Sequence, residues 1–257
     1  TPATLALSRI SLPDSGRIQE EDARYANKHR TSKHDPALPL YTEKDAYASL
    51  KQFEKIHHWQ MVPLPGGATL RFMPAGHILG SAFAEIYFEN GERILMSGDL
   101  GRYDQHIIKD PTPVEFAEYL TIESTYGDRM HSKENSGDRL AEIIGEAYRT
   151  GSAVLAPSFA IGRTQELLYE IHMLQDQERI PRIPIFVDSP MAVSTTDVYA
   201  QCREEHDKEM EEELKMQHTP LEPANLTLIR DREQSKALNS MRGPMLVIAG
   251  SGMCTGG

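Results

Sequence analysis

One histidine and two carboxylates stand at the ends of apolar runs in this 257-residue chain, where they could bind a metal ion. They are His77, Asp99 and Glu123. A neutral imidazole and carboxylate oxygens both suit zinc, and a catalytic zinc keeps one position open for water, whose pKa falls to about 7. The residue types therefore indicate a metallohydrolase. The three residues lie in the segments Met73-Pro-Ala-Gly-His-Ile-Leu-Gly80, Ser97-Gly-Asp-Leu-Gly-Arg102 and Thr121-Ile-Glu-Ser-Thr-Tyr-Gly-Asp128.

Short strands are expected to carry these side chains to one place. Asn90-Gly91 is a strong two-residue hairpin signal between two of the apolar runs. His77 and Asp99 follow neighbouring strands in glycine-rich loops, and glycine permits tight turns and close backbone approach. The two side chains can therefore converge although they are 22 positions apart. The expected strands are residues 70–73, 83–88, 93–96 and 119–122.

Each of these residues also has a simpler explanation when it is taken alone. A single histidine in a glycine-rich loop is more often structural than a metal ligand. An aspartate after Ser-Gly is most often a turn residue that hydrogen-bonds its own backbone. Spacing by itself leaves both explanations open.

Six motifs extend the pattern along almost the whole chain. Together, and in this order, they resemble the β-CASP branch of the metallo-β-lactamase superfamily, whereas any one alone would be a weak signal. That branch contains bacterial RNA-degrading enzymes and the eukaryotic pre-mRNA 3′-end endonuclease. The motifs are Gly76-His-Ile-Leu-Gly-Ser81, Ser97-Gly-Asp-Leu-Gly-Arg102, Glu123-Ser-Thr-Tyr-Gly-Asp128, Pro157-Ser-Phe-Ala-Ile-Gly-Arg-Thr-Gln-Glu166, Val187-Asp-Ser-Pro190 and Gly250-Ser-Gly-Met-Cys-Thr-Gly-Gly257.

The resemblance implies zinc-dependent hydrolysis of RNA phosphodiester bonds in RNA processing or decay, with endonucleolytic cleavage favoured. Two zinc ions are implied, with His77 as a ligand of one and Asp99 bridging both, so that a zinc-activated hydroxide attacks the phosphate. Glu123 resembles the acidic residue that orients the family's general-acid histidine and raises its basicity. The resemblance therefore makes Glu123 catalytic rather than a preferred ligand.

Parts of the family's pattern do not occur in the sequence. The His-x-His-x-Asp-His cluster that supplies four zinc ligands is absent ahead of His77, and two further histidines would follow the Thr-Gly-Gly at 255–257. The sequence is therefore interpreted as an internal fragment of a longer protein. The fragment alone is expected to be inactive and to bind zinc poorly, because two or three ligands do not make a closed site.

Net charge argues at first against a nucleic-acid partner. The chain carries −11 at pH 7, whereas phosphate binding is driven largely by basic patches. Residues 204–215 hold seven acids and two lysines, so this run contributes −5 and leaves −6 for the rest. The run is expected to be a solvated helix face. A bound metal ion would also add positive charge close to a phosphate.

The second half of the chain alternates strands and helices, which predicts a parallel sheet. The fold class is therefore α/β, and the resemblance implies a partial metallo-β-lactamase αββα sandwich with an inserted parallel β-CASP domain. The implied bounds are 1–127 for the metallo-β-lactamase part, 128–250 for the β-CASP domain and 251–257 for the return to the first domain. The expected elements are a helix at about 17–28 after Ser15-Gly16, a helix after the capping box Thr42-Glu-Lys-Asp45, helices around 140–148 and 167–174, and strands at 152–156, 183–187 and 245–249.

Loops at the carboxyl ends of the parallel strands are candidate substrate-binding positions. Ser158, Arg163 and Ser251 each place a polar group there, and Gly162-Arg163 opens a helix whose free N–H groups favour an anion such as phosphate. These three residues are predicted to grip an RNA backbone. A helix cap or turn is the competing explanation for each serine, and Arg163 could instead pair with Glu166.

Two other functions stay open. Some members of the resembled branch are catalytically inactive scaffold paralogues of active nucleases, and relatives without the inserted domain hydrolyse small esters or lactams. A cytoplasmic location without membrane association is expected, since no run approaches eighteen apolar residues. Cys202 and Cys254 support neither a disulfide framework nor a cysteine zinc site. RNA is the expected partner, and a homodimer is one option for the assembly.

Overall fold

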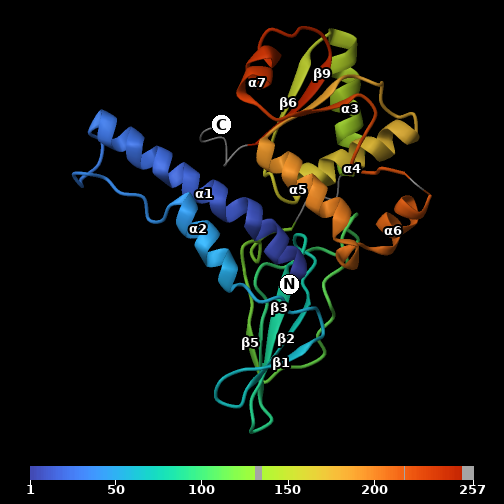
Figure 1. The fold of residues 1–257 in the computed structure, drawn as a ribbon. Coiled ribbons are helices and arrows are strands. Elements are labelled where there is room, and N and C mark those ends of the chain that lie inside the picture. Colours follow the sequence, from blue (N-terminus) through green and yellow to red (C-terminus); the bar gives the residue numbers. More distant parts are fainter. Residues whose placement is uncertain (131–134, 217, 251–257) are drawn as a thin grey trace.

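The computed structural model describes residues 1–130, 135–216 and 218–250, and within them the chain forms two β-sheets connected by helices. Figure 1 shows the first sheet at the lower end, the second sheet with its helices at the upper end, and helix α1 projecting to one side. No helix in these described ranges is long and apolar enough to cross a membrane. The helices are α1 (Pro2–His29), α2 (Glu43–Ser49), the 3₁₀ turn η1 (Leu50–Gln52), α3 (Ser136–Thr150), α4 (Arg163–Asp176), α5 (Pro190–Gln201), the 3₁₀ turn η2 (Arg203–Glu205), α6 (Lys208–Lys215) and α7 (Arg232–Leu238). The strands are β1 (Met61–Pro63), β2 (Thr69–Pro74), β3 (Ala82–Tyr87), β4 (Arg93–Met96), β5 (Tyr119–Thr121), β6 (Ala153–Ser158), β7 (Ile185–Asp188), β8 (Leu226–Ile229) and β9 (Met245–Gly250).

The first sheet has the strand order β1-β2-β3-β4-β5. Its strands are antiparallel except β4 and β5, which pair in parallel. The hairpin predicted at Asn90-Gly91 is confirmed, but its loop is longer than the two residues expected, because the N–H of Phe88 donates to the carbonyl of Glu92 at 2.9 Å and Gly91, with a φ of 88°, is the loop residue with a positive φ. All four predicted strands of this half occur, and none of their ends moves by more than one residue. The sheet therefore places the loops after β2 and β4 at the same edge.

The second sheet has the order β6-β9-β7-β8, and all of its pairings are parallel. The predicted parallel α/β sheet is therefore confirmed. Its core includes Leu168 of α4, Val187 of β7 and Ile248 of β9, each no more than 1% exposed. Burial of one such side chain stabilises a fold by about 1.5–3 kcal/mol. The core thus fixes the loops that follow the carboxyl ends of the strands.

Helix α1 begins well before the predicted start at Arg17. Thr1 is its N-cap, and the helix passes through Pro13 without ending. Proline removes one helical hydrogen bond and costs about 3 kcal/mol or more in a helix interior. Ala3 and Leu7 are buried against the rest of the chain, and this packing outweighs the local penalty. The prediction that Ser15-Gly16 precedes the helix is therefore wrong.

Gly16 serves the packing of α1 on α2 rather than the start of a helix. A Cβ atom at this position would lie 2.7 Å from the backbone nitrogen of Glu43. Glycine therefore lets the two helices approach closely. The predicted capping box is confirmed, because Thr42 and Asp45 exchange both side-chain to backbone hydrogen bonds at the start of α2.

A buried cluster joins the two halves of the chain. It includes Leu79 from the loop after β2, Tyr169 from α4 and Tyr199 from α5, each at most 2% exposed. The N–H of Leu79 donates to the Tyr199 hydroxyl at 3.1 Å. Burial raises the pKa of Tyr199 to about 12, so the hydroxyl stays protonated at neutral pH. The loop that carries His77 is thereby anchored to a helix of the second sheet.

The acidic run 204–215 is only partly the solvated helix face that its composition predicts. Helix α6 exposes Glu209 and Glu212, leaves Glu211 and Glu213 half-buried, and buries Met210 on its inner side. Glu205, however, is 4% exposed and forms a buried pair with His58. The prediction was wrong for Glu205 because its partner lies far away in the sequence.

Candidate active site

His77 and Asp99 face each other in two loops at the edge of the first sheet. His77 follows β2 and Asp99 follows β4. The Nε2 atom of His77 lies 3.9 Å from the Oδ2 atom of Asp99, and the side chains are 43% and 76% exposed. Ser81 closes the His77 loop, since its Oγ accepts the N–H groups of His77 and Ile78 at 3.0 and 3.2 Å. The His77 imidazole and the Asp99 carboxylate thus lie near each other, and both are accessible to a ligand.

Direct backbone contact holds the two loops together. The N–H of Gly101 donates to the carbonyl of Ala75 at 2.9 Å. A Cβ atom at position 101 would lie 1.7 Å from the carbonyl oxygen of Gly76, a distance that no real side chain tolerates. The approach of the Asp99 loop to the His77 loop therefore requires glycine here.

Glu123 lies beside this pair but is engaged by its own neighbours. Its Oε1 accepts the N–H of Leu100 at 2.6 Å, and its Oε2 accepts the hydroxyl of Thr125 at 2.6 Å. The Thr125 hydroxyl, the Leu100 N–H and the nearby His77 together lower the pKa of Glu123 below its ordinary value. The N–H of Glu123 donates to Ser97 at 3.1 Å. The carboxylate is therefore ionised at neutral pH and held in a fixed orientation.

The residues at this edge fit part of a zinc site. An imidazole nitrogen and a carboxylate oxygen are ligands that zinc prefers, and His77 and Asp99 present them toward one point at 3.9 Å. Among residues 1–130, 135–216 and 218–250, no group of three or more potential metal ligands occurs. The two residues therefore have the chemistry of zinc ligands, but they are fewer than a zinc site needs.

The predicted substrate-binding residues differ in their surroundings. Arg163 opens α4 and pairs with Glu166 at 2.6 Å, which was the alternative drawn from the sequence. Ser158 ends β6, is 4% exposed, and its Oγ has no hydrogen-bond partner among the described residues. Ser251 lies outside the described residues. Of the two predicted residues that the structure describes, Ser158 and Arg163, only Arg163 is exposed and could contact a substrate.

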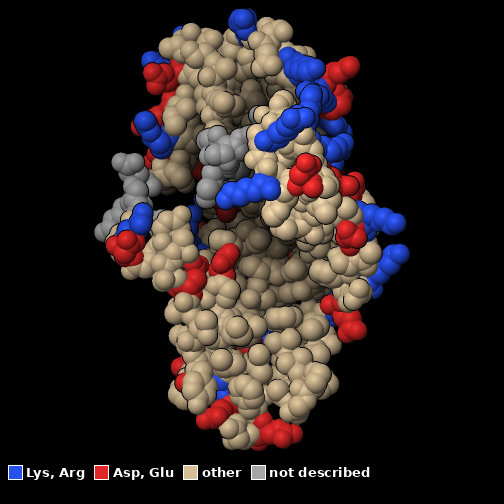
Figure 2. All heavy atoms as spheres, turned by 90° about the vertical axis from the view of Figure 1, so that its left-hand side faces the viewer, with Lys and Arg blue, Asp and Glu red and all other residues tan. Residues whose placement is uncertain are grey.

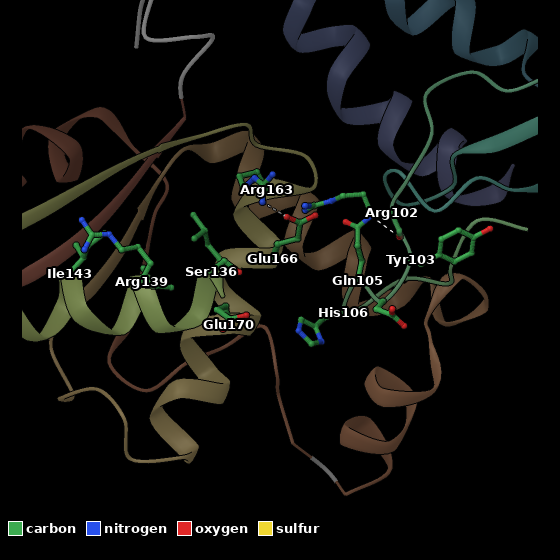
Figure 3. A pocket seen from close by; sticks show the side chains of 13 residues that line it. Arg102, Tyr103, Gln105, His106, Ser136, Arg139, Ile143, Arg163, Glu166 and Glu170 are labelled. Carbon is green, nitrogen blue, oxygen red and sulfur yellow. Dashed lines mark hydrogen bonds and ion pairs between the residues drawn. The ribbon is translucent and has the colours of Figure 1, made fainter. Parts of the chain in front are cut away.

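A cavity of about 520 Å³ lies between the loop after Asp99 and helices α3 and α4. Figure 3 shows Arg163 and Glu166 pointing toward each other at its upper side, with Arg102 beside them on the loop. Gln105 ties the cavity to the candidate site, because its Nε2 donates to the carbonyl of Gly76 at 3.1 Å. The lining residues are Arg102, Tyr103, Asp104, Gln105, His106, Ser136, Arg139, Leu140, Ile143, Arg163, Glu166, Leu167 and Glu170.

Only some of the residues that line this cavity could be expected from the sequence. Arg102 ends the motif that contains Asp99, so its place near the site could have been expected. Arg139 and His106 had no such signal. His106 stacks on Tyr169 with ring centroids 5.1 Å apart, which is a contact between segments distant in sequence. Three arginines and three carboxylates line the cavity, so its charge is mixed.

Comparisons with known proteins point to RNA-acting relatives. Residues 164–257 match the family described as the Beta-Casp domain. The chain is 33% identical to Ribonuclease TTHA0252 of Thermus thermophilus over 258 residues, which covers 100% of this chain and 55% of that protein. It is 28% identical to the RNase J-like protein of Methanocaldococcus jannaschii over 222 residues, with 84% and 50% covered. It is 34% identical to cleavage and polyadenylation specificity factor 73 of Drosophila melanogaster over 163 residues, with 62% and 24% covered.

The matches cover different parts of this chain and only part of the relatives. The Beta-Casp match begins at the first turn of α4 and includes β7, β8 and β9 of the second sheet. The chain spans about half the length of the first two relatives. The similarity to the Thermus protein covers the whole chain, and so it spans positions 77, 99 and 123 as well as the second sheet.

Proposed function

This chain belongs to the β-CASP branch of the metallo-β-lactamase superfamily, and from that premise we propose that the protein hydrolyses RNA phosphodiester bonds in RNA processing or decay. Its fold is α/β and combines part of a metallo-β-lactamase sandwich with an inserted parallel β-CASP domain. The observation that carries the proposal is the 3.9 Å approach of His77 to Asp99 in exposed loops. Relatives named as ribonucleases support RNA as the substrate. We favour endonucleolytic cleavage.

We propose two zinc ions as the cofactor. A metallohydrolase family implies a metal, and the donor set of His77 and Asp99 suits zinc. When bound, the metal ions supply an acidified water as nucleophile and offset negative charge on the phosphate. Following the resemblance to the family, we propose that His77 would hold one ion and that Asp99, whose carboxylate has two oxygens, would be shared by both.

Glu123 would act by positioning rather than as a ligand. Both of its oxygens already accept hydrogen bonds, and its lowered pKa keeps it ionised. An ionised carboxylate next to an imidazole fixes the orientation of that ring and raises its basicity. We propose that Glu123 does this for the general-acid histidine of the whole protein. Its fixed geometry supports this role.

Arg163 would contact the RNA backbone near the metal ions. Its guanidinium is exposed at the first turn of α4, where helix N–H groups also favour an anion. The pair with Glu166 is partly exposed, so a phosphate could replace it at little cost. Ser158 and Ser251 remain proposed contacts. For Ser158 the buried, unpartnered hydroxyl leaves its hydrogen-bonding capacity free among the described residues.

Cleavage of RNA by the whole purified protein tests the proposal. Zinc content and degradation of a 5′-labelled single-stranded RNA are measured for the unchanged protein and for Asp99→Ala. We expect about two zincs per chain, internal cleavage products, and loss of turnover in Asp99→Ala that exceeds the roughly 100-fold typical of removing an outer-shell partner of a metal ligand. The matched control is Asp197→Ala, which removes an exposed carboxylate from α5 and should leave cleavage unchanged.

Each other result points to a different function. Release of mononucleotides from the 5′ end would replace the endonuclease by an exonuclease. Metal-free, inactive protein would favour a scaffold paralogue, and hydrolysis of a small ester or lactam without RNA cleavage would favour a small-molecule metallohydrolase. Full activity of Asp99→Ala would overturn the site.

We also propose the location, assembly and domain bounds expected from the sequence. The bounds are 1–127, 128–250 and 251–257, the location is cytoplasmic, and a homodimer is one option for the assembly. Fractionation of cells, light scattering and limited proteolysis would check these three proposals.

A further inference from the structure

A stretch of eleven residues at the far end of α1 and the start of the loop after it carries positive charge only, and Asp22 and Asp35 lie just outside it. Residues 24–34 contain no Asp or Glu, and the four Lys and Arg leave a net charge of −15 for the remainder of the chain. All six basic side chains of this segment are exposed. We call them the basic tip. Its members are Arg24, Lys28, His29, Arg30, Lys33 and His34.

The charges of the basic tip are not neutralised within the protein. In the described parts of the chain, none of its Lys or Arg side chains forms an ion pair with a carboxylate. Arg17, two turns earlier on the same helix, contrasts with them because it pairs with Asp14 and Glu21. Figure 2, in which α1 points toward the viewer, shows most of the Lys and Arg of this face in its upper half, with some Asp and Glu among them and others at the lower end. The tip is therefore free to attract an anionic partner.

An exposed aromatic ring lies among these charges. Tyr25 is 61% exposed, and its ring centroid is 4.2 Å from that of His29. Bases of single-stranded nucleic acid stack on such rings, while basic side chains follow the backbone. An aromatic ring beside unpaired cations favours a nucleic acid over an acidic protein.

The loop after α1 is held in place by hydrogen bonds. The side chain of Asn27 donates to the carbonyl of Ala37 at 2.9 Å and accepts the N–H of Ala37 at 2.7 Å. Arg30 ends the helix in the left-handed conformation, with a φ of 53°. The N–H of Leu40 donates to Gln19 at 3.0 Å. The basic residues are thus displayed from an ordered support, which lowers the entropic cost of binding.

The opposite end of α1 touches the candidate active site. The hydroxyls of Thr1 and Thr4 donate to the carbonyl of Gly80, three residues after His77, at 3.0 and 2.8 Å. A helix of 28 residues at 1.5 Å per residue is about 42 Å long. A stacked strand rising about 3.4 Å per nucleotide covers that length in about 12 nucleotides.

We propose that the basic tip binds the backbone of the same RNA strand that enters the site of His77 and Asp99. The contact lies about 12 or more nucleotides from the scissile bond, so it selects long single-stranded RNA over short RNA. This inference rests on the proposed ribonuclease function for the identity of the strand. The tip raises affinity and takes no part in the chemical step.

Binding of RNA to the whole protein tests the tip independently of catalysis. Fluorescence anisotropy with an unstructured 30-nucleotide RNA is measured in the Asp99→Ala background, so that the RNA stays intact. The variant combines Arg24→Gln, Lys28→Gln and Lys33→Gln. The control removes three exposed charges elsewhere, by Arg149→Gln, Arg232→Gln and Lys236→Gln. Thermal melting confirms that both variants fold.

We expect the tip variant to bind the 30-mer at least tenfold more weakly at 0.1 M salt. The slope of log affinity against log salt concentration should become shallower by about 2, since three phosphate contacts are removed and each contact to a single strand contributes about 0.7. The control variant should change affinity less than twofold. With Asp99 intact, the tip variant should cleave a 10-nucleotide RNA as well as the unchanged protein does.

Failure of the tip and failure of the proposed function give different results. Equal affinity of the tip variant and the unchanged protein for the 30-mer, or an equal loss in the control variant, would overturn the tip contact even if RNA is cleaved. A tip variant that cleaves the 10-mer poorly would place these residues at the active site and would also overturn it. Absence of any RNA cleavage by the zinc-loaded protein would overturn the ribonuclease proposal, while the anisotropy result still decides whether the tip binds RNA.

Discussion

The imidazole of His58 is hydrogen-bonded to both carboxylate oxygens of Glu205, at 3.0 and 3.1 Å, where the two halves of the chain meet. The side chains are 11% and 5% exposed. The Nδ1 atom of His58 has no partner in the described part of the chain, so Glu205 is the polar anchor of the ring. This pair joins the segment before β1 to η2, across 147 positions of sequence.

Removal of His58 should destabilise the fold where the segment before β1 contacts η2. His58→Ala leaves the buried Glu205 carboxylate without its partner, and we expect a loss of about 2–4 kcal/mol in the free energy of unfolding. His57→Ala is the matched control, because the neighbouring pair of His57 and Glu204 spans 3.2 Å with side chains 61% and 43% exposed. Its loss should stay below about 1 kcal/mol. Urea denaturation measures both, and equal losses would contradict the importance of burial.

Acid should weaken the fold through His206. Burial lowers the pKa of this residue below its ordinary value, and its Nε2 lies 2.7 Å from the carbonyl of Tyr199. The unfolded state therefore binds more protons, so stability is full above about pH 6.5 and falls as the pH drops below it. As the pH falls from 6.5 to 5, the free energy of unfolding of the unchanged protein should decrease more steeply than that of His206→Gln. The difference should be at most about 1.4 kcal/mol per pH unit. Denaturation curves at several pH values measure this, with the exposed His34→Gln as control; parallel losses would refute it.

The parts of this fold that follow local rules could be predicted from the sequence. Asn90-Gly91 marks a hairpin because glycine accepts the positive φ that Gly91 has here, and the short apolar runs around it form strands at the expected positions. Thr42 and Asp45 form a capping box because the bond partners are three residues apart. His77 and Asp99 converge because each follows one of two strands in the same sheet.

Features that depend on distant segments could not be predicted in this way. Ser15-Gly16 looks like the start of a helix, but Gly16 is required by contact with Glu43 of another helix. Glu205 looks solvated within an acidic run, and only the fold brings His58 to it. The cavity beside Arg163 likewise joins a loop of the first half to helices of the second.

The ionised state of Glu123 should depend on the Thr125 hydroxyl. That hydroxyl is the main cause of the lowered pKa of Glu123, ahead of the Leu100 N–H. Thr125→Val keeps the shape and removes the donor, so the pKa should rise and the carboxyl should protonate at higher pH than before. A ¹³C NMR titration of the Glu123 carboxyl measures the shift, and the acidic limb of RNA cleavage should move the same way. Ser124→Ala is the control; an unmoved titration in Thr125→Val would disprove the assignment.

The contact between the two site loops should fail if position 101 gains a side chain. Gly101→Ala would place a Cβ atom 1.7 Å from the carbonyl oxygen of Gly76, so the loop of Asp99 must move away from His77. We expect RNA cleavage to fall by about 10²-fold, because displacements near 1 Å cost that much. Gly145→Ala on α3 is the matched control, since a Cβ there meets nothing within 4 Å. It should keep cleavage and stabilise the helix by up to about 1 kcal/mol. Steady-state cleavage and thermal melting of both variants decide the matter, and full activity of Gly101→Ala would show that the loops need not touch.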